Sequence, residues 1–235
     1  MVVICRSKED RMFEGLLEYL KEHLPQKIAD AGYSNYEIFG KEVEGSISDT
    51  IEEYLTLNGI TFISRRAKNK NTFPDLEVEI DGTKYALEHK AGIHSNKGDI
   101  DDTAANDMGT INAYPKKIRN YNDNMFCTFV KYSVLDDDTI DIEDIFFDKI
   151  YTFIGKRADG DYLSYREKDG NLRPKKWEDM SNGITYFATL DEFQDALNTT
   201  ALYRSERIAI KHIDNLRNEP ESLEMLKNHI DDLLG

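Results

Sequence analysis

The chain has 235 residues, 40% of them hydrophobic and 32% charged, which is typical of a globular protein with one substantial core and excludes a disordered polymer. The 30 basic and 45 acidic residues give a net charge of −15, which taken alone argues against nucleic-acid binding. No apolar run approaches the roughly 20 residues that span a bilayer, and the apolar start is too short for a signal peptide, so we expect a cytoplasmic protein without membrane contact.

The N-terminal quarter is predicted to be helical and to lead into a strand. Apolar residues recur at helical spacing over residues 7–30, and residues 32–45 are expected to form a loop or short connector. A second helix begins at Ser46 or Ser48, either of which can cap it, and ends before Gly59. The apolar, β-branched run 60–63 then favours a strand.

Residues 75–90 are predicted to form a two-stranded hairpin. The turn is Asp81-Gly82, a dipeptide suited to a two-residue type I′ loop. Such a turn fixes the register, because paired positions then sum to a constant, and it places Val78 opposite Tyr85 on an apolar face.

The opposite face of this hairpin carries charge. The register places Asp75 directly across from Glu88, with Lys90 two residues further along the strand. Opposed side chains lie about 4.5–5.5 Å apart at Cβ, and two carboxylates at that separation repel each other and destabilise a sheet. A chain that keeps the pair is expected to use it, most simply to hold a divalent cation.

The rest of the chain is predicted to continue with strands and helices. Pro115 opens a helix, and residues 125–132 form a buried strand. Further strand-like runs and helices are expected at 139–142, 150–154, 162–165, 190–202 and 205–234, the last with a break at Pro220.

The order of elements predicts the fold class. Over residues 46–132 the order is helix, strand, hairpin, helix, strand, which indicates an α/β (α+β) protein with a central mixed β-sheet flanked by helices. No linker or composition change divides the chain. We therefore expect residues 1–235 to form a single domain with a core at about 46–132 and helical and strand additions on both sides.

The pattern Pro74-Asp75, a gap of twelve residues, and Glu88-His89-Lys90 resembles the PD-(D/E)XK nuclease superfamily, whose restriction-endonuclease-like core also places a helix and a strand before the hairpin. The resemblance covers roughly residues 46–132. Residues 169–177 are similar to a segment near the DNA surface of type II restriction endonucleases, and the length of the chain suits one subunit of such an enzyme.

The resemblance implies a set of roles. Asp75 and Glu88 would ligate Mg²⁺, for which Mn²⁺ can substitute, and the backbone carbonyl of His89 would be a further ligand. Lys90 would orient the attacking water and stabilise charge on the scissile phosphate, while the metal lowers the pKa of the bound water. The imidazole ring of His89 is expected to pack in the core. The implied products carry 5′-phosphate and 3′-hydroxyl ends.

Many members of the superfamily add an acid from the preceding helix. Glu52 and Glu53 are the two candidates here. At about 100° per residue, Glu52 lies on the flank of the apolar helix stripe, whereas Glu53 points further toward solvent. We prefer Glu52, and the alternative is that both are ordinary surface acids.

The implied activity is cleavage of double-stranded DNA at a specific site by a homodimer, because two subunits are needed to cut both strands. There are two alternatives. One is a structure-selective nuclease of junction-resolvase or repair type, and the other is a DNA-binding module that does not cleave. Despite the net acidity, a basic cleft can hold a phosphate backbone. We expect contacts to DNA from Lys116, Lys117, Arg119, Arg173, Lys175 and Lys176.

Overall fold

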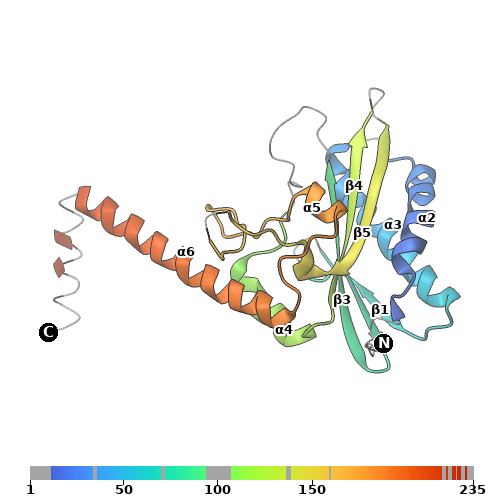
Figure 1. Ribbon diagram of the computed structural model, residues 1–235, viewed down its shortest axis with the longest axis horizontal. Helices are drawn as coiled ribbons and strands as arrows, with labels where there is room; N and C mark the ends of the chain where they lie inside the picture. The colour runs from blue at the N-terminus through green and yellow to red at the C-terminus, as the bar shows by residue number, and fades with distance from the viewer. Residues whose placement is uncertain are drawn as a thin grey trace.

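A five-stranded sheet forms the centre of the protein, seen here in a computed structural model (Figure 1). The structure describes residues 12–33, 36–69, 72–93, 107–135, 139–158 and 160–218, with positions 221, 224, 225, 227, 228 and 231. The strands follow one another in chain order across the sheet. They are β1 (Ile63–Arg66), β2 (Leu76–Ile80), β3 (Thr83–Ile93), β4 (Met125–Val134) and β5 (Ile140–Lys149).

The sheet is mixed, as the order of elements predicts. Strands β3 and β4 run parallel, and the other three neighbouring pairs run antiparallel. The parallel pair needs a crossover connection, which here includes α4 (Tyr114–Tyr121). The predicted fold class is confirmed.

The hairpin of β2 and β3 has the predicted turn and register. Asp81 and Gly82 both have positive φ, 51° and 77°, as a type I′ turn requires. Val78 pairs with Tyr85, and these side chains are buried. The register therefore follows from the turn alone.

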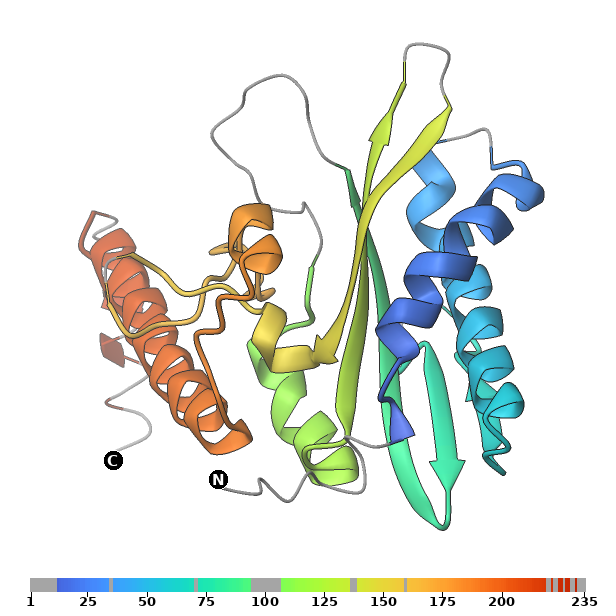
Figure 2. The ribbon, with the colours of Figure 1, turned by 45° about the vertical axis from the view of Figure 1, so that its right-hand side comes forward.

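Two helices cover one face of the sheet (Figure 2), α2 (Leu16–Ala31) and α3 (Tyr36–Leu57). The prediction of a loop over 32–45 is wrong, because α3 begins ten residues before Ser46. Phe39, Val43 and Ile47 continue one stripe at four-residue spacing, and all three are fully buried. This burial outweighs the cost of two helical glycines, about 1 kcal/mol each relative to alanine.

The helical additions cover the other face (Figure 2). Buried apolar side chains from α4, from the segment after β5 and from the start of the last helix form a second core against Phe129 and Cys127 of β4. Pro115 lies in the first turn of α4, as predicted. The elements of this face, besides α4, are η1 (Ile111–Ala113), η2 (Ile150–Phe153), α5 (Trp177–Ser181) and α6 (Leu190–Asn218).

Several predicted boundaries are wrong. The strand expected at 60–63 is β1, three residues later, where Arg65 pairs with Glu77 and Glu79 of the neighbouring strand. Residues 150–153 form the 3₁₀ helix η2 and not a strand, and Ile154, Leu163 and Tyr165 form only isolated bridges. The helices expected at 190–202 and from 205 onward are one helix as far as Asn218. Pro220 and residues 7–11 lie outside the described residues.

Within the described part of the chain, no helix is both long and apolar enough to cross a membrane.

Candidate active site

Strand β3 presents different side chains to the two cores. Leu87 and Ala91 belong to the core under α2 and α3, whereas Ala86 belongs to the core under α4. Because side chains alternate along a strand, Glu88 and Lys90 share the face of Ala86. Their side chains are 14% and 17% exposed, so the pair is largely withdrawn from solvent while still reachable.

The structure brings Asp75, Glu88 and Lys90 together. The pairing of β2 and β3 ends at Leu76 and Leu87. Asp75 is the residue just before β2, and it therefore lies at the level of Glu88. One oxygen of Asp75, Oδ2, accepts a hydrogen bond of 2.7 Å from the backbone N–H of His89. The Lys90 ammonium lies 2.7 Å from Glu88 Oε1. This is the cluster that the hairpin register predicts.

The charges in this cluster act strongly on one another. Burial is the largest cause that raises the pKa of Asp75 to about 7, and the charge of Glu88 acts in the same direction. Burial alone would lower the pKa of Lys90, but the nearby charges of Glu88 and Asp75 outweigh it and raise that pKa. Lys90 is therefore a cation at neutral pH, whereas Asp75 resists ionisation there.

The donor atoms fit a hard divalent cation. Glu88 Oε2 is buried and accepts no hydrogen bond, so one oxygen is free to ligate. Among the described residues, no three His, Cys, Asp or Glu side chains gather closely enough to hold an ion alone. Two carboxylates and a backbone carbonyl suit Mg²⁺, which keeps several waters in its coordination shell.

The ring of His89 packs in the core under α3, as predicted. It is fully buried, and its Nε2 lies 3.1 Å from the hydroxyl of Ser48. Burial is the largest cause that lowers the pKa of His89 to about 3, and the charge of Lys90 acts in the same direction. A neutral, enclosed ring on the far side of the strand is not placed to act as a base for substrate.

The helix acids lie elsewhere than the sequence suggests. Glu52 forms an ion pair with Arg66, and Glu53 lies 2.7 Å from Lys27. Glu44, by contrast, has its pKa raised by burial and is acted on by the charges of Lys90 and Glu88.

Glu44 lies on the part of α3 that passes close to strand β3, which carries Glu88 and Lys90. It precedes Ser48 by one helical turn, and Ser48 contacts His89. The sequence pattern predicts a loop over residues 32–45 and therefore does not indicate Glu44 as a helix acid. The four-residue spacing of Phe39, Val43 and Ile47 was the signal that could have extended the helix to include it.

Comparison with known proteins decides the family. The model of the NgoBV restriction endonuclease family matches residues 35–218 of the 235. The chain belongs to this family. The protein is therefore a type II site-specific endonuclease, and its substrate class is DNA.

A solved structure, that of the NlaIV restriction endonuclease, is similar to this chain in fold. The similarity has a TM-score of 0.52 and covers 83% of this chain and 76% of that one, at 17% identity. A likeness at this identity concerns the fold and says nothing about individual residues. No curated protein matches the chain.

The six cations expected to contact DNA have different surroundings in the endonuclease. Lys116, Arg119 and Lys176 are exposed. Lys175 is buried, and its ammonium donates a hydrogen bond of 2.5 Å to the carbonyl of Ile184, so its predicted contact with DNA does not fit the structure. The isolated pattern of basic residues could not reveal that burial.

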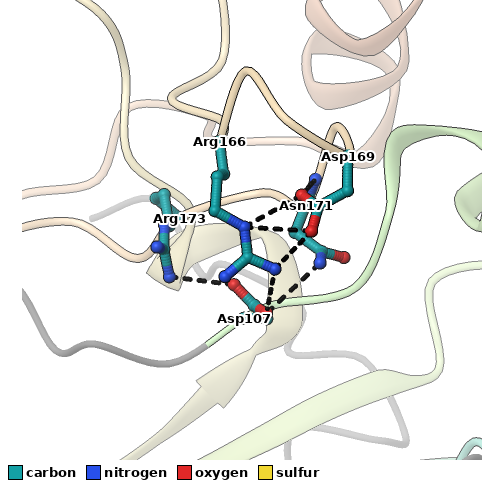
Figure 3. A network of polar contacts seen from close by, with 5 residues as sticks. All are labelled: Asp107, Arg166, Asp169, Asn171 and Arg173. Atoms are coloured by element: carbon teal, nitrogen blue, oxygen red, sulfur yellow. Dashed lines mark hydrogen bonds and ion pairs between the residues drawn. The ribbon is translucent and has the colours of Figure 1, made fainter.

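Arg173 belongs to a polar network (Figure 3). Its guanidinium lies 2.8 Å from Asp107, which also accepts a hydrogen bond of 2.9 Å from Arg166 and one of 3.2 Å from Asn171. Arg166 is further paired with Asp169. The network ties the segment before α4 to the turn at 167–169, so Arg173 has a structural partner within the chain.

Lys117, the last of the six, is partly buried near the cluster of Asp75, Glu88 and Lys90. Its ammonium lies over the rings of Phe73 and Tyr114, and the charges of Glu88 and Asp75 act on it.

Proposed function

We propose that this endonuclease hydrolyses double-stranded DNA at a specific short site with Mg²⁺ bound at Asp75 and Glu88, leaving 5′-phosphate and 3′-hydroxyl ends. The observation that carries the proposal is the cluster of two opposed carboxylates and a lysine on a strand of the family fold. The unpartnered Glu88 Oε2 supports it, since a buried carboxylate oxygen without a donor is costly unless a cation satisfies it.

Each residue of the cluster has a distinct role. Asp75, Glu88 and the carbonyl of His89 would hold Mg²⁺, for which Mn²⁺ can substitute. A bound ion of this kind polarises the phosphate and lowers the pKa of a coordinated water. Lys90, held in place by Glu88, orients the attacking water and contributes positive charge near the phosphate.

We further propose Glu44, in place of Glu52, as the acid that α3 contributes. Among the described side chains of this helix, Glu44 is an acid whose charge raises the pKa of Asp75. Glu52 is already neutralised by Arg66. Glu44 would position metal-bound water or complete the ligand shell.

The test is cleavage of plasmid and genomic DNA by the purified protein with Mg²⁺. We expect discrete fragments, and loss of cleavage on the order of 1,000-fold in Asp75→Asn and in Lys90→Met. The matched control is Glu53→Gln, which removes a carboxylate that is paired with Lys27 of α2. Absence of fragments, or unchanged cleavage by the two site variants, would contradict the proposal. A preference for branched DNA would indicate a structure-selective enzyme instead.

Contacts to DNA outside the cluster are proposed for the exposed cations. Lys116, Arg119 and Lys176 are accessible to a phosphate backbone. They would position the duplex by charge and would not read its sequence.

We also propose that two copies of the chain form a homodimer through α6. The start of this helix is buried, but beyond it Leu202, Ile210 and Ile213 are 63%, 58% and 48% exposed. Figure 1 shows this part of the helix extending away from the body of the protein. A second copy suits this surface because two active sites are needed to cut both strands.

The oligomeric state is measured by light scattering on the intact protein. We expect a dimer, and a shift to monomer in the double variant Ile210→Asp, Ile213→Asp. Leu57→Asp, which alters an apolar residue that is 73% exposed at the end of α3, is the control. A monomeric wild-type protein, both free and on DNA, would contradict this arrangement.

A further inference from the structure

Lys117 of α4 occupies an aromatic recess beside the proposed metal site. Its Nζ lies 3.8 Å from the centroid of the Phe73 ring and 4.8 Å from that of Tyr114. The Tyr114 ring is fixed, because it is fully buried and its hydroxyl donates a hydrogen bond of 2.8 Å to the carbonyl of Met108. The Phe73 ring packs edge-on against Tyr121. The ammonium is therefore held in a defined place.

The backbone leaves room for this ammonium. A Cβ at Gly109 would lie 2.9 Å from Lys117 Nζ, closer than side-chain atoms tolerate. Gly109 also has a φ of 92°, a conformation that favours glycine. The recess therefore consists of two rings and a glycine, and none of these can neutralise a charge.

Lys117 differs in this respect from Lys90. The Lys90 ammonium lies 2.7 Å from a carboxylate oxygen of Glu88. Within the described part of the chain, Lys117 forms neither a hydrogen bond nor an ion pair, and its contacts are with ring faces. Cation–π contacts are worth about 0.5–2 kcal/mol, which is less than the cost of withdrawing an ammonium from water.

The surroundings of Lys117 nevertheless include the catalytic cluster. Phe73 precedes Asp75 by two residues, and α4 covers the sheet face that carries Glu88 and Lys90. Burial lowers the pKa of Lys117, and the charges of Glu88 and Asp75 act in the opposite direction. An incompletely compensated cation thus lies near the carboxylates beside which the substrate would bring negative charge.

We propose that Lys117 is a second active-site lysine, whose ammonium contacts a non-bridging oxygen of the scissile phosphate and stabilises the charge that develops there. This inference rests on the proposed function of the Asp75–Glu88 cluster. In the reaction, the water oxygen bonds to phosphorus and the bond to the 3′ oxygen breaks, with its electron pair staying on that oxygen. The proton that water loses balances the proton that the 3′ oxygen takes up from solvent, and Lys117 keeps its own.

This role differs from that of an ordinary phosphate contact. A cation that only holds the DNA backbone contributes to affinity and to its salt dependence. A cation that meets the reacting phosphate contributes mainly to the rate of the bound complex, because the charge it stabilises grows in the transition state. The two roles separate in single-turnover kinetics.

The experiment compares Lys117→Met with Lys117→Arg in the intact protein. Methionine keeps the straight, apolar stem between the two rings and removes the charge. We expect the single-turnover rate at saturating enzyme with Mg²⁺ to fall on the order of 100-fold. DNA affinity, measured with Ca²⁺ in place of Mg²⁺, stays within about tenfold of the wild-type value. Lys117→Arg, which restores the charge, recovers at least about a tenth of the rate.

Lys27→Met serves as the matched control, because Lys27 is also partly buried but lies on α2, on the opposite face of the sheet. Folding of each variant is followed through the near-ultraviolet circular dichroism of Trp177, which is 2% exposed. If Lys117→Met is not folded at the assay temperature, Lys117→Gln takes its place with the same expected rate.

The outcomes are distinguishable from failure of the proposed function. A wild-type protein that cleaves, together with a charge-removing variant whose bound-complex rate lies within about threefold of it, would overturn the inference alone. A loss confined to DNA affinity would also overturn it, because it would make Lys117 a general backbone contact. A wild-type protein that cleaves no DNA would instead contradict the proposed function.

Discussion

Replacing Asp75 by asparagine should stabilise the metal-free protein, and more so at high pH. Burial and the charge of Glu88 raise the pKa of Asp75 from 3.8 to about 7. Such a shift corresponds to an upper bound of roughly 4 kcal/mol, at about 1.36 kcal/mol per pKa unit. Because Glu88 shares the repulsion and Asp75 keeps some contact with solvent, about 2 kcal/mol is the expected size.

The sign follows from proton linkage. Folded Asp75 keeps its proton at a pH at which unfolded Asp75 has lost it. Its stabilising contribution is complete below about pH 3.8 and is lost as the pH rises through about 7. The variant Asp75→Asn cannot ionise, yet its amide oxygen can still accept the hydrogen bond from the His89 backbone N–H.

The assay is thermal unfolding in a chelator across this pH range. We expect the melting temperature of Asp75→Asn to exceed that of the wild type by about 4–8 °C at about pH 8, with the gap shrinking toward about pH 4. Mg²⁺ at ten times its dissociation constant should stabilise the wild type by about 1.4 kcal/mol and leave the variant unchanged. Asp49→Asn, an exposed acid of α3, is the control. A gap that does not depend on pH, or a less stable variant, would refute the reasoning.

The remaining predictions concern the helix acids and the basic residues. Glu44→Gln should lower the cleavage rate about 10- to 100-fold. Glu52→Gln should lower thermal stability slightly and leave the cleavage rate within a few-fold of the wild-type rate. Equal cleavage rates for the two variants would contradict the role of Glu44. Lys175→Ala should lower the free energy of unfolding by about 1–3 kcal/mol, measured in urea, because the carbonyl of Ile184 loses its partner. An unchanged urea midpoint would refute that. DNA affinity should fall steeply with salt concentration despite the net charge of −15. Lys116→Met should reduce the slope of the logarithm of the binding constant against the logarithm of the salt concentration by about 0.9. An affinity that does not change with salt would exclude a basic cleft.

The hairpin could be predicted from the sequence because its contacts are local. A two-residue turn at Asp81-Gly82 fixes every pairing up to Leu76 and Leu87, and the alternation of a strand then decides which side chains share a face. The meeting of Asp75, Glu88 and Lys90 needs no information from distant segments.

The boundaries of other elements depend on partners far along the chain. Gly40 and Gly45 weaken the helical signal at the start of α3, and only the core under that helix decides that it continues. Arg65 and Arg66 both belong to β1, where Arg65 forms an ion pair with Glu77 of the neighbouring strand.

By itself, the sequence determined the hairpin that brings Asp75, Glu88 and Lys90 together and the class of the sheet, since both follow from short-range geometry and from the order of elements. The tertiary structure alone decided which further charges lie near this cluster. It enclosed Lys175, paired Glu52 with Arg66 and brought Glu44 and Lys117 within electrostatic range of Glu88. The physical reason is that a charge acts through distance and burial, and both are set when segments far apart in the chain pack together.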